Sequence, residues 1–180
     1  IERGRIGAVK NLSQTVPNFH APDYGSRMTS SIYVRGLGAR IDQPVIGLNI
    51  DNVPVLNKDN FDTELADAER IEVLRGPQST LYGRNTMGGV VNVYTLSPLT
   101  YEGVRLMAEY GSGDSYRFRA SSYYKLAPDL GMAVTGYYTH TGGFFENQCT
   151  GEKCDRERLG GGRWKMQWRS RRGVRIDNTL

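Results

Sequence analysis

Apolar and polar side chains alternate along most of the second half of the chain. From Val104 to Tyr110 every second residue is apolar, and Arg105, Met107 and Glu109 stand between them. A period of two is typical of a β-strand whose two faces meet different surroundings. The pattern therefore predicts a strand with one apolar face.

The same alternation returns three more times and begins again near residue 174. The further apolar positions are Tyr116, Phe118, Ala120 and Tyr124, then Leu130, Met132, Val134 and Tyr138, then Trp164, Met166 and Trp168. Residues 127–129 and 170–173 are expected to form short turns on one side, while 111–115 and the long segment 142–157 connect strands on the other. The sequence thus predicts four antiparallel strands and the start of a fifth.

Alternation alone is compatible with a soluble antiparallel sheet that has one buried face, and with strands of a membrane-spanning barrel. Hydrophobic residues make up 38% of the chain. No stretch approaches the roughly 18 consecutive apolar residues that suggest a membrane-spanning helix. We therefore exclude a spanning helix and keep the spanning barrel, whose strands have a low mean hydropathy.

The first half of the chain contains a dense run of secondary-structure signals between residues 69 and 95. Residues 71–74 are β-prone, and Gly76-Pro77 ends that segment. Pro77 suits the first position of a helix and Gly83 a left-handed helix stop, so a short helix from Pro77 to Tyr82 is expected. The β-branched residues after Gly88-Gly89 predict a second strand, which makes the run a compact α/β unit.

Three segments in this half resemble, in order, the signatures of the plug domain of TonB-dependent outer-membrane receptors. They are Tyr33-Val34-Arg35-Gly36-Leu37-Gly38, the segment from Val45 to Pro54, and the run from Glu69 to Thr95. The form Leu74-Arg75-Gly76-Pro77 is more similar to the iron-siderophore branch of the family than to its saccharide branch. The resemblance shifts the interpretation of the alternating strands towards the membrane.

The resemblance implies the fold class and the domain organisation. We expect an α/β plug domain, a small mixed sheet with short helices, in residues 1–98, truncated at its N-terminus. Residues 99–180 would form the first four to five antiparallel strands of a transmembrane β-barrel, which has about 22 strands in plugged transporters. Because lipid cannot satisfy open sheet edges, we expect this chain to be a fragment. The remaining strands, the signal peptide and the energy-coupling TonB box are expected outside it.

Charge is distributed unevenly between the two predicted domains. Residues 1–98 hold ten basic and ten acidic side chains, so the whole net charge of +4 lies in residues 99–180. The basic residues on the non-apolar face of the predicted strands are Arg105, Arg117, Arg119, Lys125, Arg163, Lys165 and Arg169. They could steer an anionic ligand such as a ferric chelate, or simply line a hydrated lumen and bond the plug. No nucleic-acid reader motif accompanies them, so no nucleic-acid partner is expected.

The two cysteines, Cys149 and Cys154, lie close together in the long 142–157 segment. A disulfide between them fits an oxidising, surface-exposed location. The alternative is a metal pair, but zinc would need further ligands and the histidines are only His20 and His140. We predict the disulfide, and no metal site.

Signals for catalysis are weak. The segment Gly83 to Val90 has the glycine spacing of a phosphate loop, yet Gly89 and Val90 stand where lysine and serine or threonine are required. Neither histidine lies in a nucleophile or metal motif. We expect no enzyme, no catalytic residue and no cofactor.

The family resemblance assigns a structural role to two arginines. In these receptors the arginines of the arginine-glycine signatures bond carboxylates on the barrel wall and hold the plug in the lumen, and the matching positions are Arg35 and Arg75. A buried bidentate guanidinium would fix the orientation of the plug. The alternative is that both arginines pair within the plug, for example with Glu69 or Glu72.

The resemblance also places ligand contacts in two plug loops at the outer end of the lumen. The corresponding residues are Arg40, Asp42 and Gln43 in the first loop, and Asn57, Lys58 and Asn60 in the second. Polar loop residues are also commonly just solvated, and their spacing does not specify a ligand.

Together these features predict part of a TonB-dependent receptor in the outer membrane of a Gram-negative bacterium. We expect it to bind a scarce solute, an anionic ferric siderophore, and to import it with energy that TonB and its inner-membrane complex relay. The expected partners are therefore TonB, the ferric chelate and the lipid bilayer. The alternatives are a cobalamin or oligosaccharide importer of the same family, and a secreted β-rich binding or adhesion module.

Overall fold

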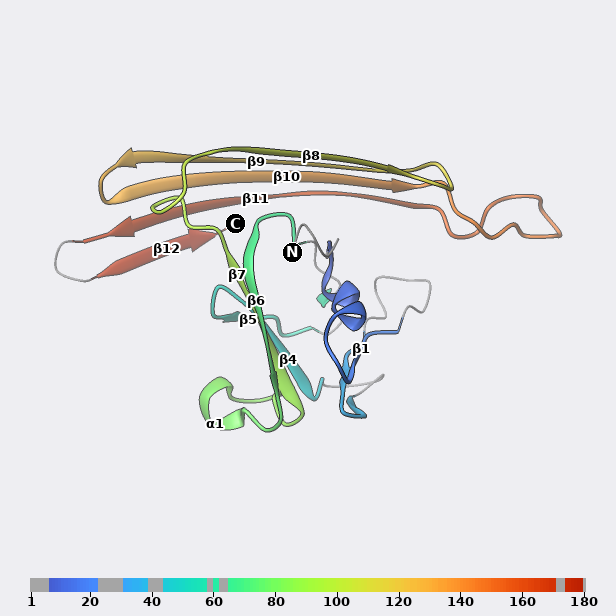
Figure 1. The fold of residues 1–180 in the computed structure, drawn as a ribbon, viewed down its shortest axis with the longest axis horizontal. Coiled ribbons are helices and arrows are strands. Elements are labelled where there is room, and N and C mark those ends of the chain that lie inside the picture. The colour runs from blue at the N-terminus through green and yellow to red at the C-terminus, as the bar shows by residue number, and fades with distance from the viewer. Residues whose placement is uncertain are drawn as a thin grey trace. The chain divides into compact units, whose positions relative to one another are not determined.

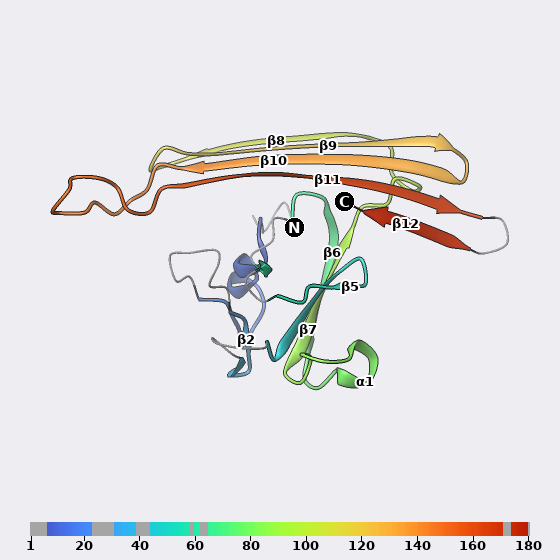
Figure 2. The same ribbon diagram turned by 180° about the vertical axis from the view of Figure 1, so that it is seen from behind.

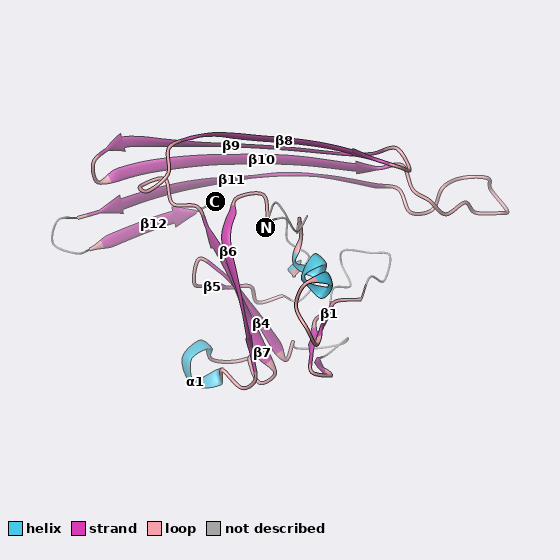
Figure 3. Cartoon of the chain, in the orientation of Figure 1, coloured by secondary structure: helices cyan, strands magenta, loops and turns pink. Residues whose placement is uncertain are grey.

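The computed structural model describes residues 7–22, 31–38, 44–57, 60–61, 65–170 and 174–179. The chain divides into two compact units, Ile1–Thr95 and Leu96–Leu180. Strands dominate in both units, and the helical segments are short (Figure 3). No helix in these described ranges is long and apolar enough to cross a membrane.

The first unit contains two small sheets. Its elements are a 3-10 helix η2 (Val9–Gln14), β1 (Phe19–His20), β2 (Tyr33–Val34), β3 (Leu37–Gly38), β4 (Ile46–Ile50), β5 (Val53–Pro54), β6 (Ala68–Arg75), α1 (Ser79–Tyr82) and β7 (Gly89–Thr95). One sheet has the order β1-β2-β3 and the other the order β5-β4-β7-β6 (Figures 1 and 2). In the second sheet β4 and β7 run parallel and the other pairs run antiparallel, which confirms the predicted small mixed sheet.

One hydrophobic core joins the parts of the first unit. Its buried members are Val9, Leu12, Phe19, Ile32, Val34, Ile46, Leu48, Phe61, Leu65, Ala68, Val91 and Val93. They come from η2, from both sheets and from the connections between them, so neither sheet has to bury its apolar face alone.

The run from residue 69 to 95 forms strand, helix and strand as predicted, but the helix begins later. It spans Ser79–Tyr82, because the segment before it continues the β6–β7 hairpin instead: the N–H of Gly76 donates to Gly88 O at 3.0 Å, and that of Gln78 to Thr86 O at 2.9 Å. Pro77 therefore lies outside the helix. Gly83 has a positive φ of 76° but a ψ of −144°, so it is not the left-handed stop that the sequence suggested.

The second unit is a single antiparallel sheet. Its strands are β8 (Gly103–Gly111), β9 (Ser115–Ala127), β10 (Leu130–Thr141), β11 (Glu157–Arg169) and β12 (Arg175–Thr179), in the order β12-β11-β10-β9-β8. Every strand pairs with its neighbours in the sequence. The β10–β11 loop extends beyond the strand ends, opposite the end at which β11 turns into β12 (Figure 1).

The register gathers the predicted apolar positions on one face of this sheet. Leu106 pairs with Ala120 and Ala120 with Gly136, while on the next row of this face Phe118 pairs with Tyr138. Leu106 is 77% exposed and Phe118 52% exposed. We call this surface the apolar face. The strand β11 is longer than the alternation predicted, because its glycine-rich first half pairs with the polar end of β10.

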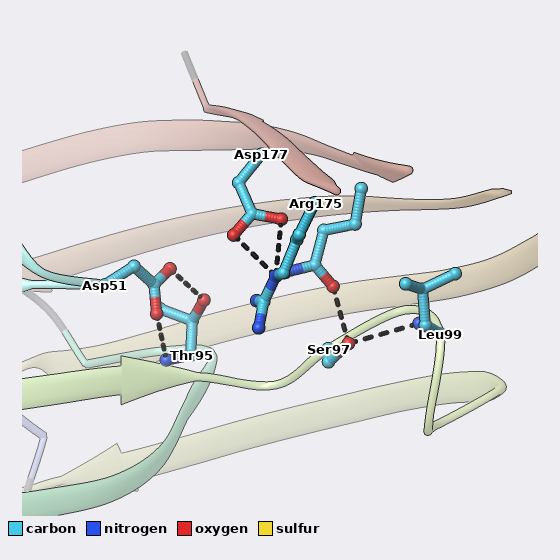
Figure 4. A network of polar contacts seen from close by, with 7 residues as sticks. Asp51, Thr95, Ser97, Leu99, Arg175 and Asp177 are labelled. Carbon is cyan, nitrogen blue, oxygen red and sulfur yellow. Dashed lines mark hydrogen bonds and ion pairs between the residues drawn. The ribbon is translucent and has the colours of Figure 1, made fainter. Parts of the chain in front are cut away.

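Polar contacts fix the ends of strands within each unit (Figure 4). In the first unit Asp51 accepts the N–H of Thr95 at 2.9 Å and its hydroxyl at 2.6 Å, at the end of β7. In the second unit Ser97 donates to the side-chain oxygen of the buried Gln167 in β11 at 2.5 Å. The contact of Ser97 anchors the segment that leads into β8 on the sheet formed by β8 to β12.

Candidate functional site

Arg35 occupies a strained position in a tight hairpin turn. Val34 pairs with Leu37 across β2 and β3, so Arg35 and Gly36 form a two-residue turn. Their φ angles are 53° and 80°. A turn with both central residues at positive φ normally contains asparagine, aspartate or glycine, and an arginine there is uncommon.

Both arginines of the predicted pair converge on one turn of the chain. The backbone N–H of Arg35 donates to Asn18 O at 2.9 Å, and Nη1 of Arg75 donates to Pro17 O at 3.2 Å. Arg75 ends β6, far along the sequence from this turn. The Pro17-Asn18 turn is not among the features predicted from the sequence, although proline followed by asparagine is a common turn signal.

A cavity of about 350 Å³ adjoins the Arg35 turn. It is lined by Asn18, Phe19, His20, Tyr33, Arg35 and Gly36. Within the described ranges, the guanidinium of Arg35 has no hydrogen-bond or ion-pair partner, and both arginines are exposed. The geometry thus places the Arg35 turn at the edge of this cavity.

The two glutamates considered as alternative partners lie on β6. Glu72 pairs with Arg70 at 3.0 Å, and the Arg70 guanidinium lies 4.4 Å from the centroid of the Tyr94 ring. The side-chain bond found for Arg75 goes to Pro17 instead. Among the described residues, Glu72 therefore forms its ion pair with Arg70 and not with Arg75.

The predicted ligand loops fall largely on residues whose positions are not described. Arg40, Asp42, Gln43 and Lys58 lie outside the described ranges. Asn57 and Asn60 are exposed, and the N–H of Asn60 donates to Asn57 O at 3.1 Å. The structure therefore brings together only this pair.

The long loop between β10 and β11 is a folded hairpin with a central carboxylate. Asp155 accepts the backbone N–H of Phe144 at 2.9 and 2.8 Å with its two oxygens, and that of Phe145 at 2.9 Å. These bonds stabilise the carboxylate and lower the pKa of Asp155 below its usual value. Asp155 is not predicted from the sequence, since nothing near it in the sequence indicates its partners.

The two cysteines lie in the same hairpin. Its backbone is closed by a bond from Asn147 N to Glu152 O at 2.8 Å and one from Cys154 N to Phe145 O at 3.0 Å. Cys149 and Cys154 are both free and exposed in the structure. The disulfide therefore stays a prediction. No group of three or more metal-ligating side chains occurs in the described ranges.

Several basic residues on the opposite side of the sheet from the apolar face make polar contacts. Arg117 pairs with Glu109 at 3.0 Å, and Nη1 of Arg119 lies 3.5 Å from the Met107 sulfur. Arg105, Arg163 and Lys165 also make contacts. Local pairing thus uses part of the positive charge that the sequence suggested for steering.

Aromatic residues occur at both ends of the apolar face, and Trp164 lies between them, opposite Val134. At one end Tyr116 stacks on His140 at 4.7 Å and on Tyr138 at 6.0 Å between ring centroids. At the other end the Trp168 indole donates to Asp129 at 3.3 Å, and Trp168 pairs with Leu130. From residue 130 to 140 a strand advances about 33 Å, or about 25 Å of height at a barrel tilt of about 40°. That height matches the apolar band of outer-membrane barrels.

Comparison with known proteins relates both units to one group. The family model described as TonB-dependent Receptor Plug Domain matches residues 1–90. The pesticin receptors of Yersinia enterocolitica and Yersinia pestis are 32% identical over 114 residues, which is 62% of this chain and 17% of theirs.

Solved structures extend the likeness over nearly the whole chain. The ferric yersiniabactin uptake receptor FyuA from Yersinia pestis is 28% identical with a TM-score of 0.81, over 93% of this chain and 27% of that one. The pyoverdine outer membrane receptor FpvA from Pseudomonas aeruginosa PAO1 shares the fold at 14% identity and a TM-score of 0.75, over 97% of this chain and 24% of that one.

The matched regions agree with the structure described above. The family model covers most of the first unit, and the solved receptors add the strands of the second, so the fold is a plug followed by the initial strands of a β-barrel. The chain spans only 17% of the length of the pesticin receptors. Its relatives are receptors rather than enzymes, and they reside in the outer membrane of Gram-negative bacteria. The chain belongs to the family of TonB-dependent outer-membrane receptors.

Proposed function

We propose that this chain forms the plug and the first barrel strands of a receptor that binds a ferric siderophore and imports it with energy relayed by TonB. The observation that carries the proposal is the likeness to FyuA, the ferric yersiniabactin uptake receptor, which matches both units at 28% identity. The energy for import would be relayed from the inner membrane by TonB.

Uptake by cells that express the full-length receptor tests this proposal. Cells are given a ferric siderophore labelled with radioactive iron, in the presence and in the absence of TonB. We expect iron to accumulate only when both the receptor and TonB are present. Binding that leads to no TonB-dependent accumulation would instead indicate a receptor or adhesin without transport, and accumulation of cobalamin or an oligosaccharide alone would reassign the substrate.

Within this function, Arg35 and Arg75 are proposed to hold the plug through carboxylates of the barrel wall. Two features support the role: the two residues meet at the Pro17-Asn18 turn, and the Arg35 side chain adjoins a cavity of about 350 Å³. Loss of either arginine would remove a charge-assisted hydrogen bond to the wall, so it should loosen the plug.

The remaining site residues complete the proposal. Arg40, Asp42, Gln43, Asn57, Lys58 and Asn60 would contact the ligand. For Asn57 and Asn60 the support is that both are exposed and joined by a backbone hydrogen bond. Alanine substitution of this pair should weaken siderophore binding to the full-length receptor, and unchanged affinity would remove the pair from the site.

A disulfide between Cys149 and Cys154 is proposed to close the hairpin loop in the oxidising exterior. Both thiols are exposed on that loop, which supports their access to an oxidant. Alkylation of the receptor purified without reductant should leave both cysteines unmodified. Modification of both would show that the loop keeps free thiols.

A further inference from the structure

A groove of about 740 Å³ lies in the sheet formed by β8 to β11. Its lining residues are Leu106, Met107, Ala108, Phe118, Arg119, Ala120, Gly136, Tyr137, Tyr138 and Gly161. They form three adjacent rows across the strands, and the two outer rows belong to the apolar face. The groove therefore opens on the apolar face, with the backbone of the middle row as its floor. Its volume is within the range of about 300–1,000 Å³ that is usual for small-molecule sites.

The groove exists because small residues stand beside large ones in register. Ala120 and Gly136 are paired neighbours and leave the floor low, while Phe118 and Tyr138, paired in the next row, form a wall. Gly136 has no positive φ, and a Cβ added there would meet nothing closer than 4.0 Å. Neither backbone conformation nor packing within the sheet requires glycine at this position, so the hollow is not a by-product of close strand packing.

A cation lies beside the groove at the end that carries the Tyr116 and His140 stack. Arg158 pairs with His140 across β10 and β11, so the two residues share the apolar face. Along β11 the next position on this face is Gly160, which pairs with the groove residue Tyr138. Arg158 is exposed. An occupant that extends from the groove towards this strand end would meet a positive charge.

We propose that the groove binds an acyl chain of an anionic membrane lipid, whose headgroup contacts Arg158. The inference rests on the proposed function in one respect, that the apolar face contacts the bilayer. The groove is continuous with that face, so the medium around it is hydrocarbon. Gly136 lies about 13 Å along the strand from His140, or about 10 Å below the aromatic end at a tilt of about 40°. An acyl chain spans this depth when its headgroup lies at the aromatic end.

Lipid retention by the purified full-length receptor tests the proposal. The receptor in mild detergent is incubated with dimyristoyl phosphatidylglycerol or with dimyristoyl phosphatidylcholine, and bound lipid is counted by native mass spectrometry. Ala120→Leu fills the groove. Ser122→Leu is the matched control, because it adds the same bulk to the same face of β9 outside the groove lining. Arg158→Gln removes the charge.

We expect the anionic lipid to be retained, and Ala120→Leu to weaken its retention by about tenfold while Ser122→Leu does not. Arg158→Gln should weaken it by about threefold and leave the zwitterionic lipid unaffected. Three outcomes would refute lipid binding in the groove: unchanged retention with Ala120→Leu, an equal loss of retention with Ser122→Leu, or retention of a second receptor copy in place of lipid. Equal retention of both lipids would overturn the headgroup contact.

Heat-modifiable migration in gels verifies that each variant forms a folded barrel. If Ala120→Leu fails to fold, Gly136→Leu fills the same groove and takes its place. The measurement involves neither siderophore nor TonB, so its failure is distinguishable from a failure of iron uptake.

Discussion

Arg35 adopts a backbone conformation that residues other than glycine, asparagine and aspartate rarely adopt. A non-glycine residue in the left-handed region costs about 1–2 kcal/mol, and Arg35 has a φ of 53°. Such strain is typical of positions where the side chain has a role that smaller turn residues cannot perform. The family resemblance could point to Arg35 from the sequence, but the strain and the contact of Arg75 with the distant Pro17 depend on the tertiary fold.

Substitution of Arg35 separates the backbone strain of the turn from the proposed bond of its guanidinium to the barrel. Arg35→Asn should stabilise the hairpin by about 1 kcal/mol, because asparagine tolerates positive φ. It should nevertheless release the plug more readily, since the guanidinium is gone. Protease accessibility of the plug in the full-length receptor, measured across a urea series, checks both effects.

The control for this prediction is Arg84→Gln, because Arg84 is an exposed arginine of the same unit in a turn after α1. Arg35→Gln and Arg75→Gln should lower the urea concentration at which the plug becomes accessible, and Arg84→Gln should not. If all three variants behave alike, Arg35 and Arg75 do not hold the plug in the barrel.

Asp155 makes the order of the long loop dependent on pH. The N–H groups of Phe144 and Phe145 lower the pKa of its carboxylate, so the stabilisation is present above the ordinary pKa of 3.8 and is lost as the pH falls through the lowered value. We expect the amides of Phe144 and Phe145 to be protected from hydrogen exchange near neutral pH, and to lose protection relative to the strands in strong acid.

Two variants test this explanation. Asp155→Ala should expose the two amides at every pH, and Glu152→Ala, which removes a carboxylate from the same loop, should leave them protected. Protection that survives in Asp155→Ala would show that the hairpin's backbone bonds suffice.

At the scale of elements, a buried amide ladder connects the parallel pair to the helix. Asn49 of β4 donates to Asn92 of β7 at 2.9 Å, and Asn92 donates to the Tyr82 hydroxyl of α1 at 3.0 Å. Asn92 is 1% exposed. Because a buried amide without a partner costs about 1–3 kcal/mol, the ladder holds the three elements in one register.

Removal of one member of the ladder should cost more than removal of two. Asn92→Val leaves the Asn49 amide unpaired and should lower the free energy of plug unfolding by about 1–3 kcal/mol. The double variant with Asn49→Val should recover much of the loss, since apolar neighbours replace the pair. Denaturant dependence of hydrogen exchange in β7 measures both, and a double variant less stable than Asn92→Val would refute the explanation.

Elements with strong periodicity could be predicted from the sequence, and those defined by partners could not. The alternation from Val104 to Tyr110 predicted β8 because the polarity of each side chain there matches the face of the sheet on which it lies. The first half of β11 contains three consecutive glycines, which carry no such signal, and it is a strand because β10 supplies its hydrogen bonds. The late start of α1 has the same origin, since residues 76–78 bond to 86–88.

At the scale of the whole molecule, the spacing of aromatics on the apolar face implies a defined position in the bilayer. Val134 lies about midway between the aromatic ends, whereas Tyr110 pairs with Tyr116 at one of them. Val134→Arg should lower the free energy of unfolding of the receptor in vesicles by about 2–4 kcal/mol, and Tyr110→Arg by at most about 1 kcal/mol. Urea titration of the full-length receptor in phosphatidylcholine vesicles measures the difference. Equal costs would place the apolar face away from lipid.

The sheet order of the second unit also has a consequence for how the protein assembles. Each of its strands bonds only to strands adjacent in the sequence, so even the longest connection, the loop between β10 and β11, closes at a modest entropic cost. The parallel pair β4 and β7 instead requires the whole segment between them to be in place. We therefore expect the hairpins of the second unit to form early and the plug sheet to form late. The plug would then be the part that unfolds most easily while the barrel strands stay folded.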